Sequence, residues 1–287
     1  MIYWIWFATL ETLNPIQKKK LLDVYNNPEK IYYEKEEKLK KLNFLTDRNI
    51  EEMRQKKDIN LLKRYQNYIK NNNIYMLNIV DNEYPEKLRN IYDPPITLFL
   101  KGNKELINKT KNIAVIGCRN ATAYGLKISE EIAYKLALND VIVVSGMAKG
   151  IDGMAHRGAL KSLCASTIAV LGSGVDYPYP TENIEIYKEI LKNNGLIISE
   201  YIVGTRPKAQ NFPKRNRIIS ALSDGVLVVE AKKKSGTMIT VDFALEQGKN
   251  VYIIPGNINS VNSEGTNELI KQGAKLVNKV EDILEDF

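Results

Sequence analysis

The sequence is short of the residues on which most catalytic and metal sites depend. It has only two cysteines, Cys118 and Cys164, and one histidine, His156, among 287 residues. Two cysteines exclude a disulfide framework and a cysteine-based metal cluster, and we expect each to be a small buried hydrophobic residue. No serine or cysteine is visibly paired with His156 as a nucleophile, so we predict no catalytic residue and no metal site. Asp152 and His156 are four residues apart and are interpreted as a structural pair on one helix.

Two nucleotide-binding signatures are also missing. There is no G-x-x-x-x-G-K-[ST] loop, which argues against ATP hydrolysis by that route. The first loop of the α/β region reads Gly117-Cys118-Arg119 instead of opening a G-x-G-x-x-G, and the next strand ends in Ser145-Gly146 without an acidic residue for a ribose. Gly172-Ser173-Gly174 is a lone G-x-G and carries little weight. We therefore expect no bound cofactor.

Long apolar runs are missing as well. The apolar start at residues 1–7 lacks a basic flank and meets Glu11 well short of the ~20 apolar residues that a membrane span needs. We predict that it forms the first buried helix, that the protein does not contact a membrane, and that it is cytoplasmic. The net charge of +7 weakly favours an anionic partner.

The first 72 residues contain no glycine, and apolar residues such as Leu10, Leu13, Leu21 and Leu22 recur near helical spacing. This pattern predicts an all-helical N-terminal domain over 1–72, of a sterile-alpha-motif or helix-hairpin-helix kind. Such a domain could dock on a partner or on nucleic acid, or be a structural appendage. Residues 74–77 and 97–100 then suggest two short strands.

From residue 111 onward, short apolar runs alternate with helical segments. The runs cover 113–116, 141–144, 167–171, 196–198, 226–229 and 251–254. Because they are apolar throughout, both faces of each strand should be covered, as in a parallel sheet between helices. We predict an α/β fold, a doubly wound, mostly parallel, extended Rossmann-like domain over 73–287 with its core motifs from 111.

Ligands of such folds bind beyond the carboxyl ends of the strands, where glycines and cations gather here. Arg119 follows the first strand and could bind a phosphate through its guanidinium or form a structural ion pair. The stretch Asn211 to Ser220, expected as a loop at the same edge, places Phe212 beside arginines as a stacking platform or a core anchor. Ser235-Gly236-Thr237 could bind an anion or simply begin a helix.

Together these stretches resemble the DprA/Smf family of bacterial DNA-processing proteins. The resemblance covers about residues 74–278 and rests on an ordered set of motifs. They are 113–119 with 121–125, 145–152 with 155–156, 168–174 with 179–180, 212–219, 230–231 with 235–240, 255–256 and 265–274, preceded by 84–88, 93–95 and 98–102.

The resemblance implies a non-catalytic protein that binds and protects incoming single-stranded DNA. It also implies that the protein forms a homodimer through the Rossmann-like domain and helps to load RecA recombinase during natural transformation and homologous recombination. We expect no C-terminal winged-helix domain. The alternative is a Rossmann-like nucleotide hydrolase of the phosphoribohydrolase type, which would use a P-G-G-x-G-T loop that this chain lacks at 230–237.

The resemblance also implies a set of DNA-binding residues. Carried over by position, they are Gly117, Arg119 and Thr122 for phosphates, Lys149 as added charge, and Asn211, Phe212, Lys214, Arg215, Asn216 and Arg217 for the rest of the pocket. Cys118 stands where serine is usual, and Lys149 stands where arginine is common. We expect Ile218 and Ile219 to bury against the sheet and to hold Arg215 and Arg217 in place.

Overall fold

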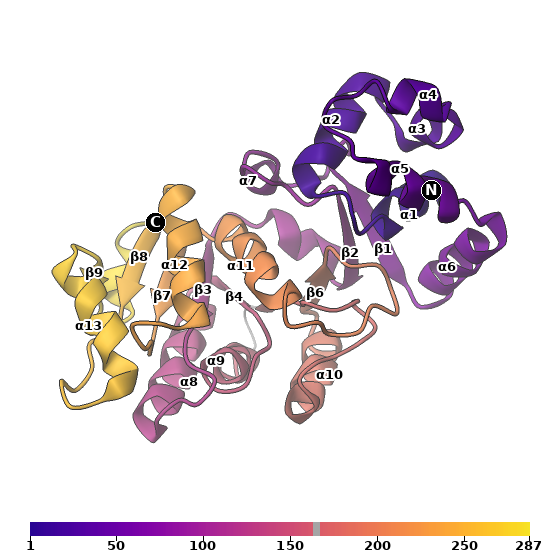
Figure 1. The fold of residues 1–287 in the computed structure, drawn as a ribbon. Helices are drawn as coiled ribbons and strands as arrows, with labels where there is room; N and C mark the ends of the chain where they lie inside the picture. The colour runs from indigo at the N-terminus through magenta and orange to yellow at the C-terminus, as the bar shows by residue number, and fades with distance from the viewer. Residues whose placement is uncertain (163–166) are drawn as a thin grey trace.

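The computed structural model describes residues 1–162 and 167–287. Within these ranges the chain forms a nine-stranded sheet in the order β1-β2-β6-β5-β4-β3-β7-β8-β9 (Figure 1). The strands are β1 (Ile74–Asn78), β2 (Thr97–Gly102), β3 (Asn112–Ile116), β4 (Ile142–Ser145), β5 (Thr167–Val170), β6 (Leu196–Ser199), β7 (Gly225–Val228), β8 (Asn250–Ile253) and β9 (Lys275–Leu276). The six apolar runs of the sequence correspond to β3 to β8, so the predicted sheet is confirmed. The short strand β9 was not predicted.

The sheet is parallel from β6 to β9, whereas β2 pairs antiparallel with both β1 and β6. The chain builds outward from β3 through β4 and β5 to β6, then returns to place β7 on the other side of β3. The strand order therefore reverses between β3 and β7. In open α/β sheets this reversal leaves a crevice at the carboxyl ends of the strands.

Helices cover both faces of the parallel part, as its apolar strands require. Ile113 and Val115 face one side, where they pack with α8 and α9, whereas Ala114 and Ile116 face the other side, which α11 and α12 cover. The helices of this region are α8 (Ala123–Leu138), α9 (Ile151–Leu160), α10 (Ile184–Lys192), α11 (Asn211–Leu222), α12 (Gly236–Glu246), α13 (Glu264–Lys271) and α14 (Glu281–Leu284). Helices α11 and α12 lie side by side on the same face of the sheet and pack against each other (Figure 1).

The N-terminal region is helical, as predicted. Its helices are α1 (Ile2–Thr9), α2 (Pro15–Tyr25), α3 (Pro28–Tyr33), α4 (Glu36–Leu39), α5 (Asp47–Gln55) and α6 (Ile59–Asn71), and α7 (Glu86–Arg89) follows β1. The apolar start forms α1 and buries Ile5, Trp6 and Phe7. Among the described residues, no helix combines the length and the apolar character that crossing a membrane requires.

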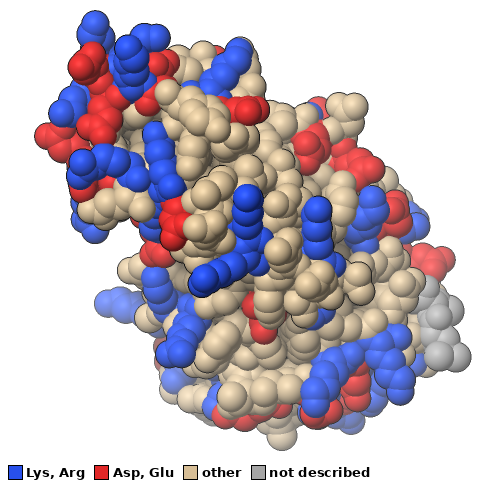
Figure 2. All heavy atoms as spheres, turned by 90° about the vertical axis from the view of Figure 1, so that its right-hand side faces the viewer, with Lys and Arg blue, Asp and Glu red and all other residues tan. Residues whose placement is uncertain are grey.

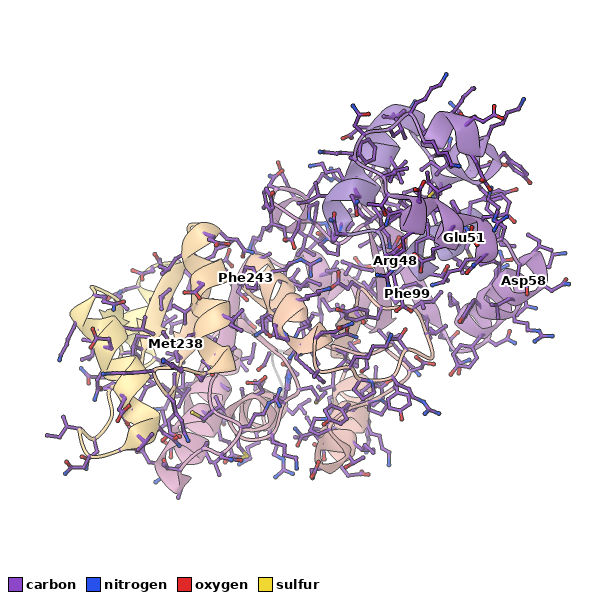
Figure 3. All side chains as sticks on the ribbon, viewed as in Figure 1. Arg48, Glu51, Asp58, Phe99, Met238 and Phe243 are labelled. Carbon is purple, nitrogen blue, oxygen red and sulfur yellow. The ribbon has the colours of Figure 1, made fainter. Side chains whose placement is uncertain are left out.

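One hydrophobic cluster runs from this helical region into the sheet, and it contains both Trp6 of α1 and Phe99 of β2. Figure 3 shows Phe99 inside, beneath helices that carry Arg48, Glu51 and Asp58 on the outside. The helices end at Asn71 and the first strand begins at Ile74, but their packing is continuous. The division into two domains at residue 72 therefore stays a prediction.

The charge of the helical region is mixed on the face that Figure 2 shows, where carboxylates lie among the lysines and arginines of its upper part. Exposed ion pairs occur in this region, such as those of Arg54 with Glu51 and Glu36. Exposed pairs of this kind contribute little to stability. The mixture gives this face no extended field of one sign.

Candidate nucleic-acid interface

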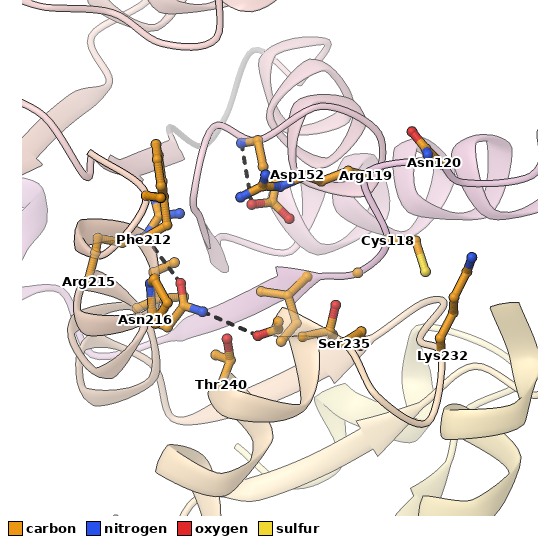
Figure 4. A pocket seen from close by; sticks show the side chains of 18 residues that line it. Cys118, Arg119, Asn120, Asp152, Phe212, Arg215, Asn216, Lys232, Ser235 and Thr240 are labelled. Carbon is orange, nitrogen blue, oxygen red and sulfur yellow. Dashed lines mark hydrogen bonds between the residues drawn. The ribbon is translucent and has the colours of Figure 1, made fainter. Parts of the chain in front are cut away.

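A crevice of about 450 Å³ lies at the carboxyl edge of the sheet, where the strand order reverses. Its floor contains Ile116 and Ile219, and its two long walls are the first turns of α11 and α12. The lining residues are Ile116, Gly117, Cys118, Arg119, Asn120, Ala148, Asp152, Ala209, Phe212, Pro213, Arg215, Asn216, Ile219, Lys232, Ser235, Gly236, Thr237 and Thr240. Figure 4 shows the walls facing each other across this space.

Phe212 stands in the first turn of α11, because the stretch expected as a loop is the start of this helix. Its ring rests on Gly172, where an added Cβ would lie 2.9 Å from the ring. The Asn211 amide fixes the same turn by donating to the Gly172 carbonyl at 3.0 Å. The Arg119 guanidinium lies 5.5 Å from the centre of the Phe212 ring, and the Tyr179 ring lies 5.6 Å from it. An aromatic ring and a cation therefore meet at one place on the crevice wall.

Arg215 projects from α11 into the base of the crevice and is almost fully buried, at 3% exposed. Its guanidinium donates to the Gly146 carbonyl at 2.6 Å and to the Val170 carbonyl. Only glycine fits at 146, since an added Cβ would lie 2.6 Å from that guanidinium. Burial lowers the pKa of Arg215 to about 10 while the Asp152 carboxylate acts in the opposite direction, so Arg215 stays charged at neutral pH. Burial in turn raises the pKa of Asp152, partly offset by Arg215.

Arg217 does not line the crevice. Its guanidinium donates to both oxygens of Glu200, at 2.8 and 2.7 Å, and lies 3.0 Å from an Asp93 carboxylate oxygen. Burial alone would lower the pKa of Arg217, but the Glu200 and Asp93 charges outweigh it and raise the pKa. Arg217 is thus a structural cation that the carboxylates of the protein already hold.

The other predicted DNA-binding residues also divide into those that line the crevice and those that do not. Gly117, Arg119 and Asn216 line the crevice, and Arg119 is exposed. Thr122 does not line it: the Thr122 hydroxyl caps α8 by accepting from the Gly125 amide and donates to Glu230. Its oxygen is therefore engaged by the protein.

Three more predicted residues lie outside the lining. Lys149 is exposed and paired with Glu182, and Asn211 is buried against Gly172. Lys214 is exposed on the outer side of α11. Ile218 and Ile219 are buried, which confirms the prediction that they bury against the sheet; that they hold Arg215 and Arg217 in place stays a prediction.

The α12 wall contains groups that the predicted site left out. Lys232, Ser235, Thr237 and Thr240 all line the crevice, and Figure 4 shows the Thr240 side chain turned toward Asn216. The Asn216 amide lies 3.4 Å from the Gly236 carbonyl and so spans the two walls. The sequence signal is Ser235-Gly236-Thr237, which predicts either an anion site or only a helix start.

The histidine is far from the role of a catalytic base, and the described cysteine, Cys118, is a lining residue with a buried thiol. His156 is fully buried, and its Nδ1 lies 2.8 Å from the Thr167 hydroxyl rather than against Asp152, which corrects the expected pairing. Burial and the Arg215 charge lower the pKa of His156 to about 3. Cys118 is buried and its thiol pKa is raised by burial, as expected for a small hydrophobic residue. Cys164 lies outside the described residues. Within the described ranges no cluster of metal-ligating residues occurs.

Comparison with protein families places most of the chain in a single group. Residues 75–287 match the family model described as "DNA recombination-mediator protein A". The chain is 41% identical to "DNA processing protein DprA" of Bacillus subtilis over 209 residues, 73% of this chain and 70% of that protein. It is 44% identical to "DNA processing protein DprA" of Streptococcus pneumoniae over 209 residues, which is 73% of each chain.

Solved structures give the same result. The X-ray structure of DNA processing protein A from Streptococcus pneumoniae superposes with a TM-score of 0.87 at 34% identity, covering 100% of this chain and 98% of that one. DNA processing protein A from Helicobacter pylori, studied for its single-stranded DNA binding mode, superposes with a TM-score of 0.67 at 33% identity. That match covers 75% of this chain and 97% of the other.

Proposed function

This chain belongs to the DprA/Smf family of DNA recombination-mediator proteins, and on that premise we propose that it binds single-stranded DNA in the crevice between α11 and α12. The observation that carries the proposal is the Arg119 guanidinium 5.5 Å from the Phe212 ring, on the wall of a crevice at the strand-order reversal. A ring flanked by a cation is the arrangement that sequence-tolerant single-strand binding uses.

Each group has a separate task. Arg119, exposed and forked, binds a phosphate through two parallel hydrogen bonds. Phe212 offers a base its ring face, and because every base has such a face, stacking does not select sequence. A duplex offers no free base to this ring, so we expect single strands to bind far better than duplexes.

Buried groups of α11 support these contacts without making them. Arg215 and Arg217 already donate to protein oxygens, so they hold the first turn of the helix before any ligand arrives. Preorganisation of this kind reduces the ordering cost of binding.

The wider role that we propose is that of the family. The protein protects incoming single-stranded DNA and helps to load RecA during natural transformation and homologous recombination. It does so as a homodimer, in the cytoplasm, and without catalysing a reaction itself. The support is the match to the recombination-mediator model and the likeness to a protein studied for its single-stranded DNA binding mode.

The test is fluorescence anisotropy with a labelled oligothymidylate and a matched duplex. We expect Arg119→Ala to weaken single-strand binding about tenfold or more, because a charge-assisted hydrogen bond contributes about 1.5–3 kcal/mol. The slope of log affinity against log salt should fall by roughly 0.7, the value for one phosphate contact on a single strand. The control is Arg157→Ala, an exposed arginine on α9 outside the crevice. Equal binding by the two variants would contradict the proposal.

A further inference from the structure

The first turn of α12 faces the crevice with its polar groups unused. Ser235 occupies the N-cap position, yet its side chain makes no capping hydrogen bond. The Ser235 hydroxyl oxygen is buried and has no partner among the described residues. The first amide groups of a helix have no partner inside the helix, and here they begin at Gly236, a lining residue with open space around its Cα.

Two threonines on the same side of α12 extend this set. Thr237 is 8% exposed and Thr240 is 2% exposed, and both line the crevice. Neither hydroxyl has a hydrogen-bond partner among the described residues. Buried hydroxyls are normally paired, so the buried, unpaired Ser235 hydroxyl on a crevice wall points to a ligand that is not yet in place.

The charges around this turn select the sign of that ligand. The start of an α-helix carries a partial positive charge, and α12 has eleven residues. Lys232 lines the crevice beside it and is exposed. Asp152 is the one carboxylate among the lining residues, and the buried Arg215 guanidinium offsets its charge. Amide groups, hydroxyls and a lysine around one helix start are suited to a phosphate.

We propose that the first turn of α12 is a second phosphate subsite, formed by Ser235, the Gly236 and Thr237 amides, the Thr237 hydroxyl and Lys232. It takes the diester phosphate that neighbours the one bound by Arg119 on the same strand. The crevice then holds two successive phosphates, one at Arg119 and one at the start of α12, with the intervening nucleotide at Phe212. This subsite rests on the proposed single-strand binding and extends it to the wall that Arg119 does not reach.

The test uses the smallest ligand that carries both phosphates. Thymidine 3′,5′-bisphosphate, thymidine 5′-monophosphate and orthophosphate compete with a labelled oligothymidylate at constant ionic strength. In the unaltered protein we expect the bisphosphate to compete about tenfold better than the monophosphate, which corresponds to one further charge-assisted contact. Thr237→Val, which keeps the shape of the side chain, and Lys232→Gln should each reduce this advantage to about threefold or less.

The control is Lys233→Gln, since Lys233 is exposed on the same loop but does not line the crevice. It should keep the full bisphosphate advantage, and Thr237→Ser should restore what Thr237→Val loses. Equal competition by bisphosphate and monophosphate in the unaltered protein would overturn the subsite while leaving single-strand binding intact. Competition by orthophosphate as strong as that of the bisphosphate would show a free-anion site instead. Failure of the oligothymidylate to bind would overturn the proposed function itself.

Discussion

The two walls of the crevice differ in whether the protein itself supplies hydrogen-bond partners for their polar groups. On the α11 wall, Asn211 and Arg215 donate to carbonyl groups of the protein, and Arg217 behind them is paired with Glu200 and Asp93. On the α12 wall, the hydroxyls of Ser235 and Thr237 have no partner among the described residues. The polar groups of the α11 wall already have partners within the free protein, whereas those of the α12 wall gain their partners from the bound ligand.

The difference follows from the free-energy cost of burying each kind of group without a hydrogen-bond partner. An unpaired buried charge is far more costly than an unpaired hydroxyl, so the arginines of α11 need partners whether or not DNA is present. Hydroxyls and helix-start amides can remain unpaired at smaller cost. In a binding crevice, hydroxyls and amides can therefore remain unpaired until the ligand binds. The buried cations must instead be paired with other groups of the protein.

The largest effect should come from removing the buried cation Arg217 of α11. We expect Arg217→Met to lower the free energy of unfolding by about 3–5 kcal/mol, because the partly buried carboxylates of Glu200 and Asp93 lose their shared cation. Urea unfolding measures this, and Lys214→Met is the control, since Lys214 is exposed on the same helix and should change stability by less than about 0.5 kcal/mol. Similar losses in both variants would show that Arg217 is not the support that its contacts indicate.

The next effect tests the one α11 side chain that both lines the crevice and offers a ring. We expect Phe212→Ala to weaken oligothymidylate binding by about 1–3 kcal/mol, the usual value of one base stacked on an aromatic ring. Anisotropy titration of folded variants measures it. Phe243→Ala is the matched control, because Phe243 is a half-buried ring on α12 that does not line the crevice (Figure 3). If the Phe243 variant lost as much affinity, stacking at Phe212 would be ruled out as the cause.

The sequence was sufficient to predict the sheet and the place of the crevice. Runs such as 113–116 and 226–229 are apolar on both faces, and strands of a parallel sheet covered by helices have this pattern. Glycines and cations after these runs identified the edge at which ligands bind. The pairing of β2 with β6 was not predicted, because strand partners far apart in sequence leave no local signal. The strand β9 was not predicted because it has only two residues.

The orientation of the arginines was not predicted for a similar reason. Residues 211–220 were expected as a loop, in which Phe212, Arg215, Asn216 and Arg217 could all face the DNA. In a helix, positions three and four apart share a face while positions two apart do not. Phe212, Arg215 and Asn216 therefore share the crevice side, and Arg217 points away. Its partner Asp93 lies more than a hundred residues earlier in the chain, so the pairing could not be read from the local sequence.

The smallest effect concerns His156 of α9, the single histidine of the chain, which is fully buried. The Thr167 hydroxyl donates to the Val143 carbonyl, so the contact between His156 and Thr167 uses the proton on Nδ1 of a neutral imidazole. Its Nε2 has no partner among the described residues, and a proton added there would be a buried donor without an acceptor. This agrees with a pKa lowered to about 3 in the folded protein.

In the unfolded chain this histidine takes up a proton near pH 6.5, whereas in the folded protein it does not. The unfolded state therefore binds more protons between pH 6.5 and about 3, and the free energy of unfolding should fall by about 1.4 kcal/mol per pH unit below 6.5. The raised pKa of Asp152 acts in the opposite direction at lower pH, so the comparison belongs between pH 7 and 5. Urea midpoints across this range should decline less steeply in His156→Asn, which has no imidazole to titrate. If both proteins declined equally, His156 would not be the group responsible for the loss of stability at low pH.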